Sequence, residues 1–158
     1  QHPNIKVIIA RLGNVYGDIK NRGLIREVFQ SFFKKDKSEG VVISGDGKQV
    51  RDFVFVDDAS HALARLLVAP GVPTSIVNVT TGVGSSLLEV VSKIEKITGE
   101  KTVYSFGQPL TETFSVIGDN SNLKSIIGWA PDTDLESGLR KTYKRYIVKN
   151  PAPENAGH

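Results

Sequence analysis

The sequence predicts an α/β protein in which strands and helices alternate, and three of its features point that way. Residues 5–10, IKVIIA, form a nearly continuous apolar run, which is typical of a strand covered on both faces in a parallel sheet. Apolar residues return at helical spacing over residues 23–35. Strand-like and helix-like segments then keep alternating along 158 residues, a length typical of about one domain.

The expected elements follow one another in a regular order. A strand like 5–10 needs neighbours on both sides and only QHPN precedes it, so we expect the C-terminal part of a longer protein. A loop at 11–18 follows this strand, and the glycine turn 45–49 separates two short apolar strands. The predicted strands are 5–10, 39–44, 51–56, 74–80 and 101–106, and the predicted helices are 23–35, 58–69, 86–99, 121–128 and 134–149.

Residues at the helix ends explain where several of these helices start and stop. Asp57 or Asp58 is expected to cap the helix that follows the third strand, because a carboxylate accepts from unpaired backbone amides there. Ser85 or Ser86 has the same role before the helix 86–99. Gly99 stands at the usual helix stop.

Composition excludes several classes of function. The net charge is only +3 and the basic residues are scattered, so a nucleic-acid partner is not supported. No apolar run approaches the length of a membrane span, and no signal-peptide pattern occurs. The absence of cysteine excludes disulfides, thiolate catalysis and cysteine-ligated zinc, and the three histidines are far apart in sequence. We therefore predict a cytoplasmic protein without a metal site.

Two sequence patterns imitate functional motifs without fulfilling them. Residues 81–87, TGVGSSL, follow a strand and open a helix, but Leu87 stands where a dinucleotide fingerprint needs its third glycine. A turn with a serine helix cap explains this segment better. Tyr16 and Lys20 have a Tyr-x-x-x-Lys spacing, which has geometric meaning only on a helix. Because they fall in the predicted loop, we reject them as a catalytic pair.

Asn14 is the first candidate binding residue. It comes directly after the buried strand, and ligands of open α/β sheets bind at the carboxyl ends of parallel strands. Its amide can donate and accept, which suits a phosphate oxygen or a carboxamide. An asparagine that stabilises a turn has the same pattern, so the residues alone leave both readings open.

Arg51 is the second candidate, because it lies between the glycine turn and an apolar strand. A guanidinium whose stem is anchored in this way suits bidentate recognition of a phosphate. The alternative is an internal salt bridge to one of three nearby carboxylates, those of Asp52, Asp57 and Asp58.

Taken together, five segments resemble the C-terminal half of the extended short-chain dehydrogenase/reductase family, the NAD-dependent nucleotide-sugar epimerases and dehydratases that include UDP-glucose 4-epimerase. They are RLGNVYG (11–17), GLI (23–25), VVISGDGKQVRDFVFVDDASHAL (41–63), VNVTTGVGSSLLEVVSKIEKITG (77–99) and DNSNLKSIIGWAPDTDLESGL (119–139). The resemblance implies the C-terminal part of an NAD(P)-binding Rossmann fold with its small substrate-binding domain over residues 1–150. Residues 5–17 and 75–99 would contribute Rossmann-type elements, and 151–158 would be a flexible tail.

The resemblance also implies binding roles. Leu12, Asn14 and Val15 would lie against the nicotinamide end of NAD, with Asn14 also reaching the phosphate of a nucleoside-diphosphate sugar, and Arg51 would grip its diphosphate. The nucleotide itself would meet four further positions: Leu24 on the base or ribose, the backbone of Val42 and Ser44 at the base edge, and Glu112 at the ribose. No catalytic residue of the family falls within the chain.

Three departures qualify this resemblance. Pro109 stands where the family usually has a second phosphate-binding arginine, and Gly23 where some epimerases have asparagine. The family's glycine-rich loop and its catalytic Tyr-x-x-x-Lys are expected upstream of Gln1, in an N-terminal Rossmann half. We therefore expect a chain that binds substrate, is incomplete for catalysis and could pair with a second copy. A non-catalytic nucleotide-binding or interaction module, or a reductase of a non-nucleotide substrate, are the alternatives.

Overall fold

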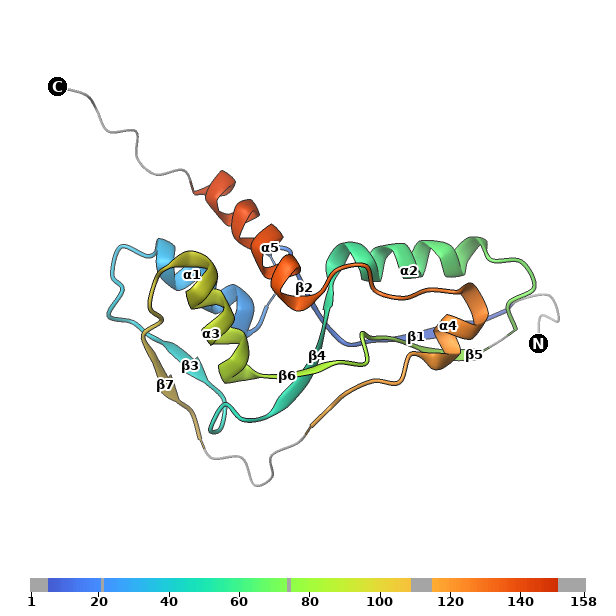
Figure 1. The fold of residues 1–158 in the computed structure, drawn as a ribbon, viewed down its shortest axis with the longest axis horizontal. Coiled ribbons are helices and arrows are strands. Elements are labelled where there is room, and N and C mark those ends of the chain that lie inside the picture. Colours follow the sequence, from blue (N-terminus) through green and yellow to red (C-terminus); the bar gives the residue numbers. More distant parts are fainter. Residues whose placement is uncertain (1–5, 21, 74, 109–114, 151–158) are drawn as a thin grey trace. The chain divides into compact units, whose positions relative to one another are not determined.

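The computed structural model describes residues 6–20, 22–73, 75–108 and 115–150. Strands and helices alternate along the chain, and the strand pairs that join β1 with β5, β2 with β4 and β3 with β7 are parallel (Figure 1). This arrangement confirms the predicted α/β class. The chain divides into two compact units, the first formed by Gln1–Tyr16, Val50–Ser85 and Phe114–Leu135 and the second by Gly17–Gln49, Ser86–Thr113 and Glu136–His158.

The first unit is built on the parallel pair of β1 (Ile8–Leu12) and β5 (Ser75–Val79). The register places Ala10 beside Val77 and extends to the end of both strands. Strand β1 therefore extends beyond the apolar run into the first two residues of the segment predicted as a loop, because the ladder with β5 supplies partners for Arg11 and Leu12.

The same unit contains a three-stranded sheet in the order β2 (Asn14–Tyr16), β4 (Val50–Phe55) and β6 (Gly84–Ser86). The prediction of a continuous loop at 11–18 is therefore wrong over its first six residues, where Gly13 alone separates β1 from β2. The Gly13 amide donates to the Val79 carbonyl at 3.0 Å. A side chain at Gly13 would come within 3.1 Å of the Asp52 carbonyl oxygen, so glycine permits this close crossing.

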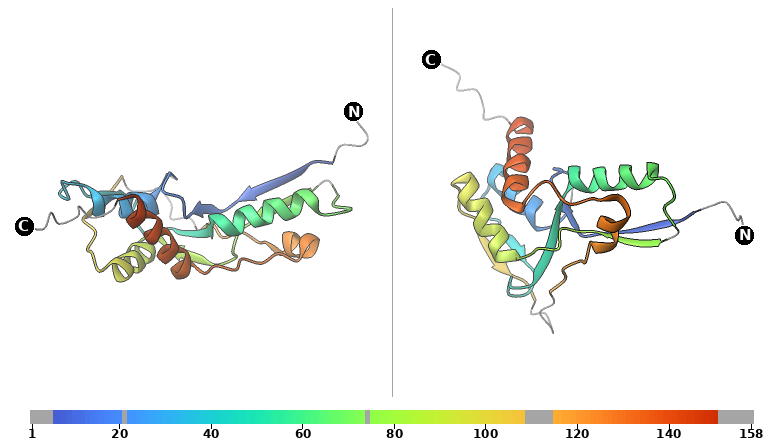
Figure 2. Two further views of the ribbon diagram at one scale, coloured as in Figure 1. Left: turned by 90° about the horizontal axis from the view of Figure 1, so that it is seen from above. Right: turned by 45° about the vertical axis from the view of Figure 1, so that its right-hand side comes forward.

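Helices α2 (Val56–Val68) and α4 (Ser121–Ile127) complete the first unit. The helix α2 lies alongside β1 and β5 in every view (Figures 1 and 2). Together these elements enclose one apolar cluster. Burial of its side chains is the main source of stability for this unit. Its buried members are Val54, Ala59, Ala62, Leu66, Val77, Val79, Leu123 and Trp129.

The prediction that Asp57 or Asp58 caps α2 is wrong. The cap position is Phe55, which has no capping side chain, and both acids lie inside the first turn. Asp58 is buried, and its carboxylate accepts hydrogen bonds from the Thr133 amide at 2.9 Å and the Thr133 hydroxyl at 3.2 Å. Asp58 thus bonds to Thr133, which is distant in sequence, and does not cap the helix as the local rule predicts.

The second unit contains α1 (Leu24–Phe33), β3 (Val41–Ile43), α3 (Leu87–Thr98), β7 (Tyr104–Phe106) and most of α5 (Leu135–Lys149). The Phe29 ring stacks on Tyr143 and Tyr146, with centroids 5.8 and 5.3 Å apart. Strands β3 and β7 pair in parallel. Among the described residues, none of the helices has both the length and the apolar character needed to cross a bilayer.

Helix α3 carries the caps that the sequence predicts. The Ser86 hydroxyl accepts from the Glu89 amide at 3.2 Å, and the Glu89 carboxylate accepts from the Ser86 amide at 2.8 Å. This reciprocal capping box selects Ser86 over Ser85. At the other end, Gly99 adopts φ 76° and donates its amide to Glu95.

We expect Ser86→Ala to lower the free energy of unfolding by about 1 kcal/mol, because one amide of the first turn loses its acceptor. Urea denaturation followed by circular dichroism measures the change. Ser85→Ala is the matched control and should stay within about 0.5 kcal/mol of the parent. Equal stability of the two variants would show that the capping box contributes nothing.

Candidate functional site

A hollow of about 290 Å³ in the first unit lies where β1 and β5 end. Three residues with predicted binding roles, Leu12, Asn14 and Arg51, line it together. We call it the two-arginine hollow, because a second arginine also contributes to its wall. Its lining residues are Arg11, Leu12, Gly13, Asn14, Arg51, Asp52, Asn78, Thr80, Val116 and Gly118.

Backbone contacts on both sides hold Arg51 at the hollow. Its position in β4 forms a parallel bridge with Val116. The Asp52 amide donates to the Val116 carbonyl at 3.1 Å, and the Val116 amide donates to the Val50 carbonyl at 3.0 Å. The half-buried Arg51 side chain donates from Nη1 to the Val50 carbonyl at 2.8 Å. These contacts fix where its guanidinium begins, and that group is a planar fork of N–H donors.

The neighbouring Asp52 is a buried structural carboxylate, with an exposed fraction of 2%. Its Oδ1 accepts from the Thr81 amide at 2.8 Å and the Thr81 hydroxyl at 2.7 Å. Its Oδ2 accepts from the amides of Gly82 at 2.9 Å and Gly118 at 3.3 Å. Asp52 therefore has structural partners other than Arg51, and so does Asp58. Both carboxylates belong to the salt-bridge alternative for Arg51.

The far wall of the hollow depends on Thr80 and Gly118. A side chain at Gly118 would come within 2.5 Å of the Thr80 hydroxyl, so only glycine fits there. The Asn120 amide group donates to the Thr80 carbonyl at 2.8 Å and closes this contact from the other side. Thr80 is 6% exposed, and its hydroxyl has no hydrogen-bond partner within the described part of the chain.

Residues 12–15 present two kinds of side chain. Leu12 is 49% exposed, and Asn14 is exposed at the start of β2, paired with Phe53 in a strand and not set in a turn. Val15 is half-buried and packs against the apolar cluster of the first unit. Only the backbone of Val15 is therefore suited to the predicted contact with a cofactor.

The other predicted binding residues belong to the second unit or lie outside the described residues. Leu24 is the first residue of α1 and is half-buried. Val42 is 60% exposed in β3, and the Ser44 carbonyl accepts from the Gln49 side chain at 2.7 Å. Glu112, like Pro109, falls outside the described residues.

The structure agrees with the rejection of both imitating motifs. Tyr16 is buried at the end of β2 and its hydroxyl donates to the Leu135 carbonyl at 3.3 Å. Burial, with smaller contributions from Asp134 and Asp58, raises the pKa of the Tyr16 phenol, so it holds its proton firmly. In the TGVGSSL segment, a side chain at Gly84 would come within 2.4 Å of Val50, so this glycine permits close packing.

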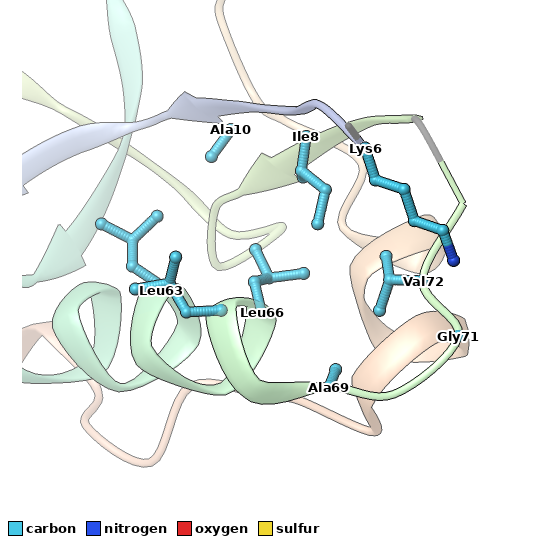
Figure 3. A pocket seen from close by; sticks show the side chains of 9 residues that line it. Lys6, Ile8, Ala10, Leu63, Leu66, Ala69, Gly71 and Val72 are labelled. Atoms are coloured by element: carbon cyan, nitrogen blue, oxygen red, sulfur yellow. The ribbon is translucent and has the colours of Figure 1, made fainter. Parts of the chain in front are cut away.

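A larger hollow of about 630 Å³ lies between β1 and α2 (Figure 3). Ile8 and Ala10 point from the strand toward Leu66 of the helix. Of its described lining residues only Lys6 is charged, and the others are aliphatic side chains and Gly71. Such a lining cannot orient a polar ligand, which needs several fixed polar groups. The smaller two-arginine hollow is therefore the candidate site.

Sequence reasoning missed three polar side chains of this site, those of Arg11, Asn78 and Thr80. Arg11 and Asn78 are the penultimate residues of β1 and β5, and Thr80 follows β5, at the sheet edge where ligands bind. The signal that could have found them is the strand alternation, which places Arg11 on the face opposite to Ala10. The prediction of 11–18 as a loop removed that signal.

Comparison with known proteins gives these residues a family context. Residues 1–80 match the NAD dependent epimerase/dehydratase family. The chain is 32% identical, over 93% of its length, to GDP-L-fucose synthase of Azorhizobium caulinodans, and 32% identical, over 87%, to a putative UDP-glucose 4-epimerase of Methanocaldococcus jannaschii. It covers 49% and 44% of those two proteins, so it spans about half the length of the curated relatives it matches.

Solved structures agree with this context. The chain superposes on UDP-glucuronic acid 4-epimerase from Bacillus cereus, solved with UDP-glucuronic acid and NAD, with a TM-score of 0.81 and 25% identity. For UDP-glucose 4-epimerase from Thermotoga maritima, solved with UDP-glucose, the TM-score is 0.80 and the identity 28%. Both matches cover 94% of this chain and 48% of the solved chain. They confirm the predicted fold, the C-terminal part of a Rossmann-type extended dehydrogenase/reductase.

We expect Asp52→Asn to lower the free energy of unfolding by about 3 kcal/mol, since an amide nitrogen would face backbone N–H donors in a buried site. Asp46→Asn is the matched control, because that exposed carboxylate accepts from the Lys48 amide at the surface. In urea denaturation, the free energy of unfolding of Asp46→Asn should change by less than about 0.5 kcal/mol. A parent-like Asp52→Asn variant would contradict the structural role of this carboxylate.

Proposed function

Because the chain belongs to the NAD-dependent epimerase/dehydratase family, we propose that it is the nucleotide-sugar-binding half of an NAD-dependent nucleotide-sugar epimerase or dehydratase. The observation that carries the proposal is the two-arginine hollow. It brings Arg51 and Asn14, from the starts of β4 and β2, beside Leu12 at the carboxyl ends of β1 and β5, where ligands of such sheets bind. In this proposal the chain supplies the grip on the substrate and one wall of the active site.

Arg51 has the central role in the proposed binding. A diphosphate carries charge that a guanidinium can neutralise while donating two parallel hydrogen bonds. The hydrogen bond from Arg51 to the Val50 carbonyl and the clamped backbone of β4 support such a role, since an anchored group loses little freedom on binding. A fixed diphosphate in turn sets the direction of the sugar toward the cofactor.

The family is NAD-dependent, and the residues beside the hollow fit only one end of that cofactor. The half-exposed Leu12 suits the face of the nicotinamide ring, and the Asn14 amide suits its carboxamide. Within the described residues, the glycine-containing segment before α3 includes strand β6 and serves strand packing and a helix cap, so it offers no pyrophosphate cradle. We assign Leu12, Asn14 and the Val15 backbone to the nicotinamide end. Bound NAD supplies a hydride acceptor.

The second unit is proposed to recognise the nucleotide through Leu24, Val42, Ser44 and Glu112. Because the Ser44 carbonyl is engaged by Gln49, the Ser44 amide is the group we assign to the base edge. The relatives are named for GDP-, UDP- and CDP-linked sugars, so the base and the sugar are left open. A homodimer and a cytoplasmic location remain predictions.

The chain is proposed to lack the chemical step. Tyr16, which imitates the family's tyrosine by spacing, is buried and bonded to the Leu135 carbonyl, so it cannot reach a sugar hydroxyl as a base. In this proposal the proton-transfer group and the pyrophosphate cradle come from polypeptide outside these 158 residues.

We expect Arg51→Ala to weaken binding of a nucleoside-diphosphate sugar by about 10- to 100-fold, the loss typical of one charged hydrogen-bonding partner. Titration calorimetry with UDP-, dTDP-, GDP- and CDP-glucose measures it. Arg140→Ala is the control, because that arginine pairs with Glu136 on an exposed face of α5. Unchanged affinity in Arg51→Ala would remove this residue from the site.

We also expect the chain alone, supplied with NAD, to convert none of these sugars, because it lacks a positioned proton acceptor. Proton NMR of UDP-glucose incubated with the chain and NAD gives the readout. Conversion that is abolished by Arg51→Ala would overturn the proposed incompleteness, while the binding role of Arg51 would stand.

A further inference from the structure

We propose that Arg11 is a second phosphate-binding residue of the two-arginine hollow, where it takes one phosphoryl group of the diphosphate while Arg51 takes the other. This inference rests on the proposed function and names a group that sequence reasoning did not assign. It makes the hollow a site for two linked phosphoryl groups and not for a single phosphate.

The geometry of the β1–β5 pair carries the first step. Arg11 lies beside Asn78 in the parallel register, and both residues line the hollow. The preceding pair, Ala10 and Val77, contributes to the apolar cluster beneath α2. Because successive side chains of a strand point to opposite faces, Arg11 and Asn78 face away from that cluster. Arg11 is exposed there, so its guanidinium is accessible to a ligand.

The charge of the lining carries the second step. Of the described residues that line the hollow, only Arg11, Arg51 and Asp52 have formal charges. Without Arg11, the charges of Arg51 and of the buried Asp52 carboxylate would cancel and the hollow would be formally neutral. Arg11 makes it cationic. The diphosphate of a nucleotide sugar carries two negative charges, and an arginine keeps its charge at every physiological pH. A lining with two arginines therefore matches the ligand better than a lining with one.

The state of the polar groups carries the third step. Within the described residues, no ion pair or hydrogen bond engages the Arg11 side chain. Thr80, which is 6% exposed in the same wall, has a buried hydroxyl oxygen that also has no partner there. A donor that an anion in the hollow can reach is the exposed Arg11 guanidinium. Arg11 would also supply the charge that Pro109 cannot supply at the position where the resemblance implies an arginine.

The test compares a nucleoside diphosphate with its monophosphate, because only the diphosphate can reach both arginines. UDP, GDP, CDP and dTDP are titrated first, and the tightest binder is then compared with its monophosphate. We expect Arg11→Ala to weaken diphosphate binding by about 10- to 100-fold. The same variant should weaken monophosphate binding by less than about fivefold. Arg11→Lys keeps the charge and loses the planar fork, so its affinity for the diphosphate should lie between that of the parent and that of Arg11→Ala.

Lys6→Ala is the matched control, since Lys6 is an exposed cation just before β1 that lines the other hollow. Urea denaturation of each variant confirms folding. If Arg51→Ala weakens diphosphate binding and Arg11→Ala does not, this inference is overturned and the proposed function stands. An equal loss for both nucleotides in Arg11→Ala also overturns it. If the parent chain binds no nucleotide at all, the proposed function itself fails.

Discussion

The buried carboxylate of Asp52 is the interaction on which the candidate site depends. It joins three parts of the first unit: strand β4, the turn at Thr81 and Gly82 after β5, and Gly118 before α4. A buried carboxylate that lost these donors would be a costly unpaired charge, so the segments are held in one arrangement. Arg51 directly precedes Asp52 in the same strand, and its position follows from this anchor.

In our proposal, the two-arginine hollow recognises what the nucleotide sugars in its relatives' names share. The relatives carry the names of GDP-fucose, UDP-glucose and CDP-abequose enzymes, which differ in base, sugar and reaction. The diphosphate link is common to such nucleotide sugars, and a hollow lined by guanidinium, amide and hydroxyl groups is suited to that link and not to a particular base. In our proposal the base, the sugar and the chemical step depend on other parts of the protein.

The sequence predicted local structure well where neighbours along the chain decide it. The capping box of Ser86 and Glu89 spans three residues, and Gly99 and Gly128 end their helices through left-handed backbone conformations. Prediction failed where distant partners compete. Asp58 bonds to Thr133, 75 positions away, instead of capping α2, and the ladder with β5 turned part of the expected loop into strand.

The α/β class, the order of the elements apart from strands β2 and β6, and the candidate role of Arg51 were therefore available from the sequence by itself, because they rest on periodicity, turn residues and a recognisable motif. Only the tertiary structure decided that Arg11, Asn78 and Thr80 share a wall with Arg51 and that Asp52 is a structural anchor. The physical reason is the distance along the chain: the hydrogen bonds of Asp52 to Thr81 and Gly118 span 29 and 66 positions. No local rule encodes such contacts, because they form only when the strands pack together.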